Sequence, residues 1–151
     1  RIASVTLRDA EGVERTHFRA GEPLQVVVRY AFGRPLPNPI LGVDFLREDG
    51  THLFTTSNYD HQVWWQNLLP EGEIVLDVEM LALNEGRYRL QVNLFADCDR
   101  PAWWEYPEDE RPEAAYFTII TGRSANGSVY LPTKWLPPTV SQKAESPVDG
   151  L

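Results

Sequence analysis

The chain contains a single cysteine, Cys98, among its 151 residues. An internal disulfide is therefore impossible, which fits a reducing compartment. No run of 18 apolar residues occurs, so the sequence predicts no membrane-spanning helix, and it shows no signal peptide. The only methionine is Met80 and the chain begins at Arg1. From this we expect a domain excised from a longer protein, or a processed form.

Basic residues are scarce, with 14 Lys and Arg against 22 Asp and Glu, and the formal net charge is -8. This balance argues against binding nucleic acid or an anionic membrane, but it would not repel a neutral polymer. The sequence also lacks a phosphate-binding glycine loop and a G-x-S-x-G motif, so this chain is not expected to hydrolyse ATP itself. His17, His52 and His61 lack metal-ligand spacing. We therefore expect no metal and no cofactor.

Acidic residues gather near aromatic ones in the stretch 97–112. A glycosidase needs two carboxylates at a set separation in space, which a sequence does not show. Calcium needs several oxygen ligands, and no EF-hand-like spacing supports a calcium site here. A solvated acidic surface is the simpler interpretation, and we expect a domain without catalytic activity. The acids are Asp97, Asp99, Glu105, Glu108, Asp109 and Glu110.

Alternation of apolar and polar residues is the dominant pattern, and turn signals interrupt it every eight to twelve residues. This pattern predicts an all-β protein, an immunoglobulin-like or jelly-roll antiparallel β-sandwich of seven to eight strands and no helix. We expect the sandwich to span residues 1–136 and a disordered tail to follow over 137–151. The predicted strands are 2–8, 24–30, 41–45, 51–57, 73–81, 87–95, 114–121 and 128–131.

The predicted strand 87–95 alternates with unusual regularity. Its apolar face predicts core packing, and its polar face is either solvent-exposed, which is the commoner case, or occupied by a ligand. Gln and Asn have poor strand propensity, which favours the second interpretation. If neighbouring strands share the sheet, they would add Arg47 or Asp44, and Gln25 or Arg29. The apolar face is Tyr88, Leu90, Val92 and Leu94, and the polar face is Arg87, Arg89, Gln91 and Asn93.

Two tryptophan pairs, Trp64-Trp65 and Trp103-Trp104, lie in the predicted loops 58–70 and 97–112, with Tyr59 beside the first. Adjacent residues of an extended chain point in opposite directions, so both members of a pair cannot enter one core. Flat rings beside polar groups suit a sugar, which has an apolar face and a fringe of hydroxyls. The alternative is that the rings plug the ends of the sandwich. We take Tyr59, Trp64, Trp65 and Trp103 as candidate ligand contacts.

Several short motifs occur in a recognisable order. Gly21-Glu22-Pro23-Leu24 leads into one strand, Pro39-Ile40-Leu41-Gly42-Val43 opens the next, and Asp49-Gly50 and Asn58 follow. Leu83, Gly86 and Tyr88 then form L-x-x-G-x-Y, and Gly127, Val129, Leu131, Pro132 and Trp135 close the series. In this order, over residues 2–135, they resemble the C-terminal carbohydrate-binding domain of Wzt, the ATPase subunit of Wzm–Wzt O-antigen ABC transporters.

The resemblance implies an immunoglobulin-like sandwich that follows a nucleotide-binding domain, at the cytoplasmic face of the bacterial inner membrane. It implies non-catalytic recognition of an O-antigen-type, lipid-linked polysaccharide, and partnership with a membrane-spanning exporter subunit. It also implies a homodimer that exchanges its C-terminal strand, here residues 127–135. The loop 97–112 is not part of the family pattern, and the identity of the glycan does not carry over.

Two alternative functions stay open at this point. A glycan-degrading enzyme, or the carbohydrate-binding module of one, would need a carboxylate pair with separated pKa values in a cleft. A structural dimerisation module would use the tryptophans as interface anchors. We expect the face of Arg87, Arg89, Gln91 and Asn93, flanked by Trp64, Trp65 or Trp103, to bind the end of a polysaccharide. The tryptophan-bearing loops themselves are an equal alternative for the site.

Overall fold

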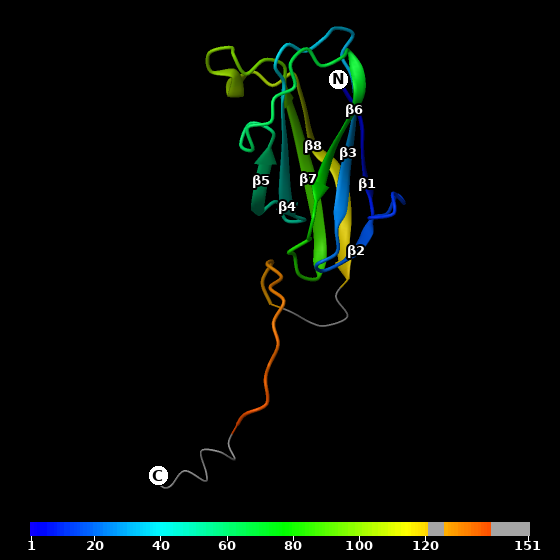
Figure 1. Cartoon of the computed structure of the whole chain (residues 1–151), viewed down its shortest axis with the longest axis vertical. Coiled ribbons are helices and arrows are strands. Elements are labelled where there is room, and N and C mark those ends of the chain that lie inside the picture. Colours follow the sequence, from blue (N-terminus) through cyan, green and yellow to red (C-terminus); the bar gives the residue numbers. More distant parts are fainter. Residues whose placement is uncertain (121–125, 140–151) are drawn as a thin grey trace.

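The computed structural model of the chain describes residues 1–120 and 126–139. Two β-sheets pack face to face, and every neighbouring pair of strands is antiparallel except β2 with β8 (Figure 1). The smaller sheet has the order β1 (Ile2–Arg8), β3 (Leu24–Ala31), β6 (Glu71–Val78). The larger sheet has the order β2 (His17–Arg19), β8 (Asp109–Ile120), β7 (Gly86–Phe95), β4 (Ile40–Arg47), β5 (His52–Ser57). The predicted all-β sandwich is thus confirmed.

The core lies between the inner faces of the two sheets and follows the predicted alternation. Leu90 and Val92 of β7 are fully buried, as are Val26 of β3 and Ile119 of β8. On the inner face of the larger sheet, Phe117 contacts Tyr88, Phe45 and Phe18 through ring pairs. No helix long and apolar enough to cross a membrane occurs within residues 1–120 and 126–139.

The strand β8 begins at Asp109, five residues before the predicted start at 114. Leu90 pairs with Ala115 and Val92 pairs with Arg111, so residues 112–114 lie opposite Gln91 alone and form a bulge. Pro112 has no N–H to donate to a ladder, and a bulge is one of the few places where a sheet accepts it. Because proline is usually excluded from strands, the first half of β8 was not predicted from the sequence.

Other boundaries also differ from the prediction. The three-residue strand β2 was too short for its periodicity to be seen, and β6 covers Glu71–Val78 instead of 73–81. A single 3-10 turn, η1 (Trp103–Glu105), interrupts the loop in which no helix was expected. Residue 121, the last of the predicted strand 114–121, and residues 140–151 of the predicted tail lie outside the described residues.

The segment 128–131 is not the strand that the sequence predicted. Val129 forms one isolated antiparallel bridge with Leu83 of the same chain, and the amide of Tyr130 donates to the carbonyl of Ala82 at 2.8 Å. This pairing within one chain counts against exchange of residues 128–131 between protomers. Beyond it, residues 131–139 run away from the sandwich (Figure 1). The side chain of Trp135 is 96% exposed.

Tyr88 explains the L-x-x-G-x-Y motif. Its hydroxyl donates to the carbonyl of Asn84 at 2.7 Å, four residues upstream, and its ring stacks on Phe117. A tyrosine at the start of a strand that bonds back to the preceding turn is a tyrosine corner, a hallmark of immunoglobulin-like sandwiches. The buried Asn84 amide in turn donates to the carbonyls of Gly127 and Val129, both at 2.9 Å, which holds the segment after β8 against this turn.

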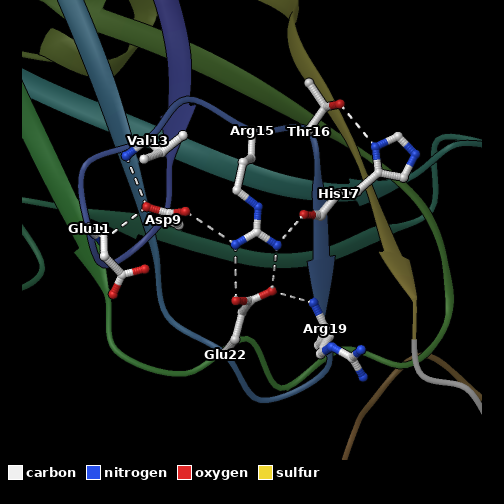
Figure 2. A network of polar contacts seen from close by, with 8 residues as sticks. All are labelled: Asp9, Glu11, Val13, Arg15, Thr16, His17, Arg19 and Glu22. Carbon is white, nitrogen blue, oxygen red and sulfur yellow. Dashed lines mark hydrogen bonds and ion pairs between the residues drawn. The ribbon is translucent and has the colours of Figure 1, made fainter.

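Glu22 of the G-E-P-L motif belongs to an ion-pair network near β2 (Figure 2). Arg15 lies between two carboxylates, 3.3 Å from Asp9 and 3.1 Å from Glu22. Glu22 also accepts the backbone N–H of Arg19. Hydrogen bonding to Glu22 raises the pKa of the Arg15 guanidinium. The network ties the β1–β2 turn to the β2–β3 turn, so this motif residue is structural.

Asp9 gives the fold a predicted pH dependence. The backbone amides of Val13 and Glu11 donate to Oδ1 at 2.9 Å and, together with Arg15, lower the pKa of this carboxyl although burial opposes them. A depressed carboxyl pKa contributes stability above the unfolded value of about 3.9, and that stability is lost as pH falls through the folded value. Asp9→Asn should therefore lose less stability between pH 6 and pH 2 than the unmodified chain. Urea unfolding at each pH tests this, and parallel pH profiles would contradict it.

Candidate functional site

The outer face of the larger sheet carries a band of polar side chains. On β7, Gln91 and Asn93 point away from the core and are half-buried. Register places Asp44 of β4 beside Gln91, and Gly42 of β4 and Glu110 of β8 on the two sides of Asn93. Directly opposed residues share a face of the sheet, so these groups form one surface. Two residues of the predicted polar face, Gln91 and Asn93, thus lie beside polar groups from two neighbouring strands.

The arginines lie toward the opposite end of β7, and Arg87 already has protein partners. The guanidinium of Arg87 is 4.8 Å from the centre of the Tyr116 ring and 3.2 Å from Glu48. Tyr116 donates its hydroxyl to Glu113, and this hydrogen bond raises the pKa of Tyr116. Arg89 faces Tyr116 across the β7–β8 ladder. Arg87 is thus engaged on the sheet, whereas the buried Nε of Arg89 has no hydrogen-bond partner among the described residues. Gln91 separates both arginines from Asn93.

Aromatic rings from two loops meet at the far end of the same face. Phe95, the last residue of β7, points outward, and Trp103 stands edge-on to it with ring centres 5.1 Å apart. Tyr59 lies 5.2 Å from Trp103 and 5.6 Å from Trp64. We call Phe95, Trp103, Tyr59 and Trp64 the aromatic wall. Trp104 extends it, 5.9 Å from Trp103, and is 62% exposed.

Trp65 takes no part in the aromatic wall. It packs against the hydrophobic core and lines an apolar groove of about 360 Å³ between β4 and β6, together with Leu41, Val63 and Ile74. The two residues of the pair thus point in opposite directions, as the extended-chain argument predicts. Trp64 reaches the outer face, whereas the candidate role of Trp65 loses its structural basis.

Three other polar candidates lie away from the band. Gln25 and Arg29 belong to β3 in the smaller sheet, so they cannot extend this face, and Arg29 pairs with Glu73 at 3.0 Å. Arg47 pairs with Tyr88 at the end of β4, and its guanidinium donates to the hydroxyl of Ser128 at 3.1 Å. The alternation of apolar and polar residues in the sequence indicates which way a side chain points, but it does not indicate which sheet a strand joins.

Asn58 positions the first aromatic loop. It is buried, its Oδ1 accepts the amide of Leu41 at 2.8 Å, and its Nδ2 donates to the carbonyls of Pro39 at 3.1 Å and Val63 at 2.9 Å. These bonds tie the end of β5 to the start of β4 and set the direction of the chain just before Trp64. A buried amide with three partners is costly to leave unpaired. Sequence reasoning noted Asn58 as a motif residue but did not find this role.

The second aromatic loop is shaped by its own polar and backbone groups. Ala102 adopts the left-handed conformation, with φ of 54°, directly before η1. This conformation is unfavourable for a residue with a Cβ, so surrounding contacts must hold it. Asp97 accepts the amide of Asp99 at 3.0 Å, and Asp99 accepts from the side chain of Asn38 at 3.3 Å. Acids of this loop therefore serve its folding.

A hydroxyl, a histidine and a carboxylate meet on β4 and β5 without forming a catalytic triad. His52 Nε2 lies 2.6 Å from Thr55 Oγ1 and 3.5 Å from Asp44 Oδ1, and Thr55 donates to Asp44. A triad histidine faces its nucleophile and its acid with different ring nitrogens, whereas one nitrogen faces both here. Over the part of the chain that the structure describes, no three His, Cys, Asp or Glu residues are placed to hold a metal ion.

Comparison with known proteins gives one family and one fold. The family model described as the Wzt C-terminal domain matches residues 1–131. A solved structure described as the crystal structure of the C-terminal domain of wzt is similar, with a TM-score of 0.74 and 16% sequence identity, over 91% of this chain and 83% of that chain. At this identity the structural similarity shows the fold alone. A search of curated proteins found no match.

Proposed function

Because this chain belongs to the Wzt C-terminal domain family, we propose that it recognises a polysaccharide on behalf of an O-antigen ABC transporter ATPase subunit. The motif order in the sequence predicted this family, and the family model bears the prediction out. In this proposal the domain binds an O-antigen-type, lipid-linked glycan and performs no chemistry on it.

The juxtaposition of the polar band with the aromatic wall is the observation that supports the proposal. Gln91 and Asn93 offer amide donors and acceptors, and Asp44 and Glu110 offer acceptors, on one surface. The aromatic wall borders that surface through Phe95. A pyranose needs both elements, because its ring hydrogens form an apolar face and its hydroxyls form a hydrogen-bonding rim. Polar groups placed beside aromatic rings are the usual composition of a small-ligand site.

Binding on such an open surface requires several contacts at once. Each hydrogen bond to a hydroxyl contributes about 0.5–1.5 kcal/mol net, whereas micromolar affinity corresponds to about 8.2 kcal/mol. One sugar on one ring is therefore insufficient. The band and the aromatic wall together offer enough contacts for two or more sugar units, and this favours an oligosaccharide or the end of a polymer as ligand.

The proposal makes this domain one part of a larger transporter complex. A nucleotide-binding domain would precede it in the full subunit, and a membrane-spanning exporter subunit would be its partner at the cytoplasmic face of the inner membrane. Homodimerisation is also part of the proposal. The exposed apolar side chains of Leu131, Trp135 and Leu136, on a segment leaving the sandwich, are suited to contact a second copy.

That exposed segment also supports the second candidate function, a structural dimerisation module. In that role the protein would associate through residues 131–139 and the outer face would bind no sugar. Light scattering of the chain, with and without a saturating oligosaccharide, separates the two functions. A dimer that binds saccharide supports the main proposal, and a dimer that binds none supports the second.

A glycan array followed by calorimetric titration tests the proposed function. We expect binding to a subset of bacterial O-antigen-type polysaccharides, with micromolar affinity and without any change in their length. A chain that binds no saccharide on the array and in titration would contradict the proposal. Shortening of the glycan during incubation would support the enzyme alternative instead.

A further inference from the structure

Gly42 interrupts the polar band at its centre. It lies in the middle of β4, between Asn93 of β7 and Ser57 of β5, while its neighbours Leu41 and Val43 point into the core. A Cβ built on Gly42 would point outward and would meet nothing closer than the Asn93 carbonyl oxygen at 4.0 Å. The outer face is thus open above this residue, down to the backbone.

Fold stability does not account for a glycine at this position. Glycine weakens a strand interior, and where it occurs it often marks a site that another group approaches closely. Its φ is not in the left-handed region that requires glycine, unlike that of Gly50 in the following turn. No side chain presses on it, in contrast to Gly72, where a Cβ would lie 2.9 Å from the Tyr30 hydroxyl. The open space itself is therefore the feature to explain.

The surroundings of this notch match one sugar ring. Asn93 borders it, and its Oδ1 is covered and has no hydrogen-bond donor among the described residues. Because protein atoms cover that oxygen, a ligand hydroxyl would reach it only after the Asn93 side chain turned, and would then satisfy an unpaired acceptor. Two residues farther along β7, about 7 Å away, Phe95 and Trp103 begin the aromatic wall. A ring of pyranose size can thus lie on the backbone with one edge against the wall.

The charge around the notch is negative. Asp44 follows Gly42 on the same face, and Glu110 lies across Asn93. The basic group that contacts either carboxylate in the described residues is His52, near Asp44, whereas Arg87 and Arg89 lie toward the other end of β7. A uronic acid or a phosphorylated sugar would be repelled here, while hydroxyls can donate to both carboxylates.

We infer that the Gly42 backbone is the floor of a subsite for one uncharged pyranose, bounded by Asn93 and the aromatic wall. The inference rests on the proposed function and deepens it, because it assigns a specificity-determining position and a class of sugar. The absence of a side chain on Gly42 determines how deep the subsite is. The carboxylates of Asp44 and Glu110 determine that it prefers an uncharged sugar.

Variants at Gly42 test the floor directly. Gly42→Ala places one carbon in the notch without a clash. Gly42→Val places three carbons there, and valine is favoured in strands. We expect titration with an uncharged oligosaccharide selected on the array to show binding roughly tenfold weaker for Ala, and weaker still for Val. The matched control is Thr118→Ile, which enlarges the same face beside Arg87 and should leave binding unchanged.

The outcomes separate this inference from the proposed function. If the unmodified chain binds no saccharide, the proposed function itself fails. If it binds, and both Gly42 variants bind equally well while their unfolding curves stay cooperative, the floor assignment is wrong. An acidic oligosaccharide of equal length should bind about tenfold less tightly at low salt and gain relative affinity as salt rises. Equal or tighter binding of the acidic oligosaccharide would contradict the inference that the subsite takes an uncharged sugar.

Discussion

Replacing Leu90 with alanine is expected to lower the free energy of unfolding by about 2–5 kcal/mol. Leu90 is fully buried on β7, between its cross-strand partners Phe45 and Ala115. Because β7 lies at the centre of the larger sheet, few atoms can move to fill the cavity that the substitution leaves. The net stability of a domain of this size is only about 5–15 kcal/mol, so the loss would be a large fraction of it. Urea unfolding followed by tryptophan fluorescence measures the effect.

The adjacent residue provides the control. Gln91 lies on the same strand but points outward and is half-buried, so Gln91→Ala should change the unfolding free energy by no more than about 0.5 kcal/mol. Leu90→Ala and Gln91→Ala differ mainly in the direction of the side chain that is removed, because the two residues are adjacent on one strand and share its neighbouring strands. Equal destabilisation by both substitutions would show that the outer face is structural, and would contradict the separation of core and site.

Replacing Trp103 with alanine is expected to weaken saccharide binding by about 10- to 100-fold, which corresponds to about 1.4–2.8 kcal/mol. Trp103 contacts Phe95, Tyr59 and Trp104, so its removal deletes one ring and also the support of its neighbours. Aromatic contacts of this kind are each worth about 0.5–1.5 kcal/mol beyond the area they bury. Titration with a short monovalent oligosaccharide measures the loss without an avidity contribution.

Trp135 offers a matched tryptophan control for that experiment. It is 96% exposed. The segment 131–139 leaves the sandwich at the end opposite to the loop that carries η1 (Figure 1). Trp135→Ala should leave the affinity for a monovalent oligosaccharide unchanged. If Trp135→Ala weakened binding and Trp103→Ala did not, the ligand would contact the C-terminal segment, and the aromatic wall would have no role in recognition.

Hydrophobic periodicity predicted the parts of this fold in which strands are long and half-exposed. The strand 87–95 and the direction of each of its side chains are as predicted, because one buried face imposes period two. The start of β8 was missed because Pro112 is accommodated in a bulge. The three-residue β2 was missed because it is too short to show a period. Sheet membership, which excludes Gln25 and Arg29 from the face, depends on long-range pairing that local pattern does not encode.

Several residues of the family motifs turn out to be supports of the fold, whereas Gly42 of the Pro39–Val43 motif lies in the candidate site. Glu22 closes an ion-pair network, Asn58 ties one aromatic loop to β4, and Tyr88 forms a tyrosine corner. These roles need a defined residue at a defined turn, so their order along the chain is visible in sequence. The candidate site is different, because it is assembled from strands and loops distant in sequence. Gly42, Phe95 and Glu110 joined it only once strand register was known.

The central claim is that the outer face of the larger sheet binds the polysaccharide. The most direct test is calorimetric titration of a combined Gln91→Ala and Asn93→Ala variant with the saccharide that the unmodified chain binds. Loss of two or more hydrogen bonds, each worth about 0.5–1.5 kcal/mol, should weaken binding about tenfold or more, while the unfolding curve stays close to that of the unmodified chain. Unchanged affinity in a folded double variant would contradict the claim and remove this strand face as the binding site.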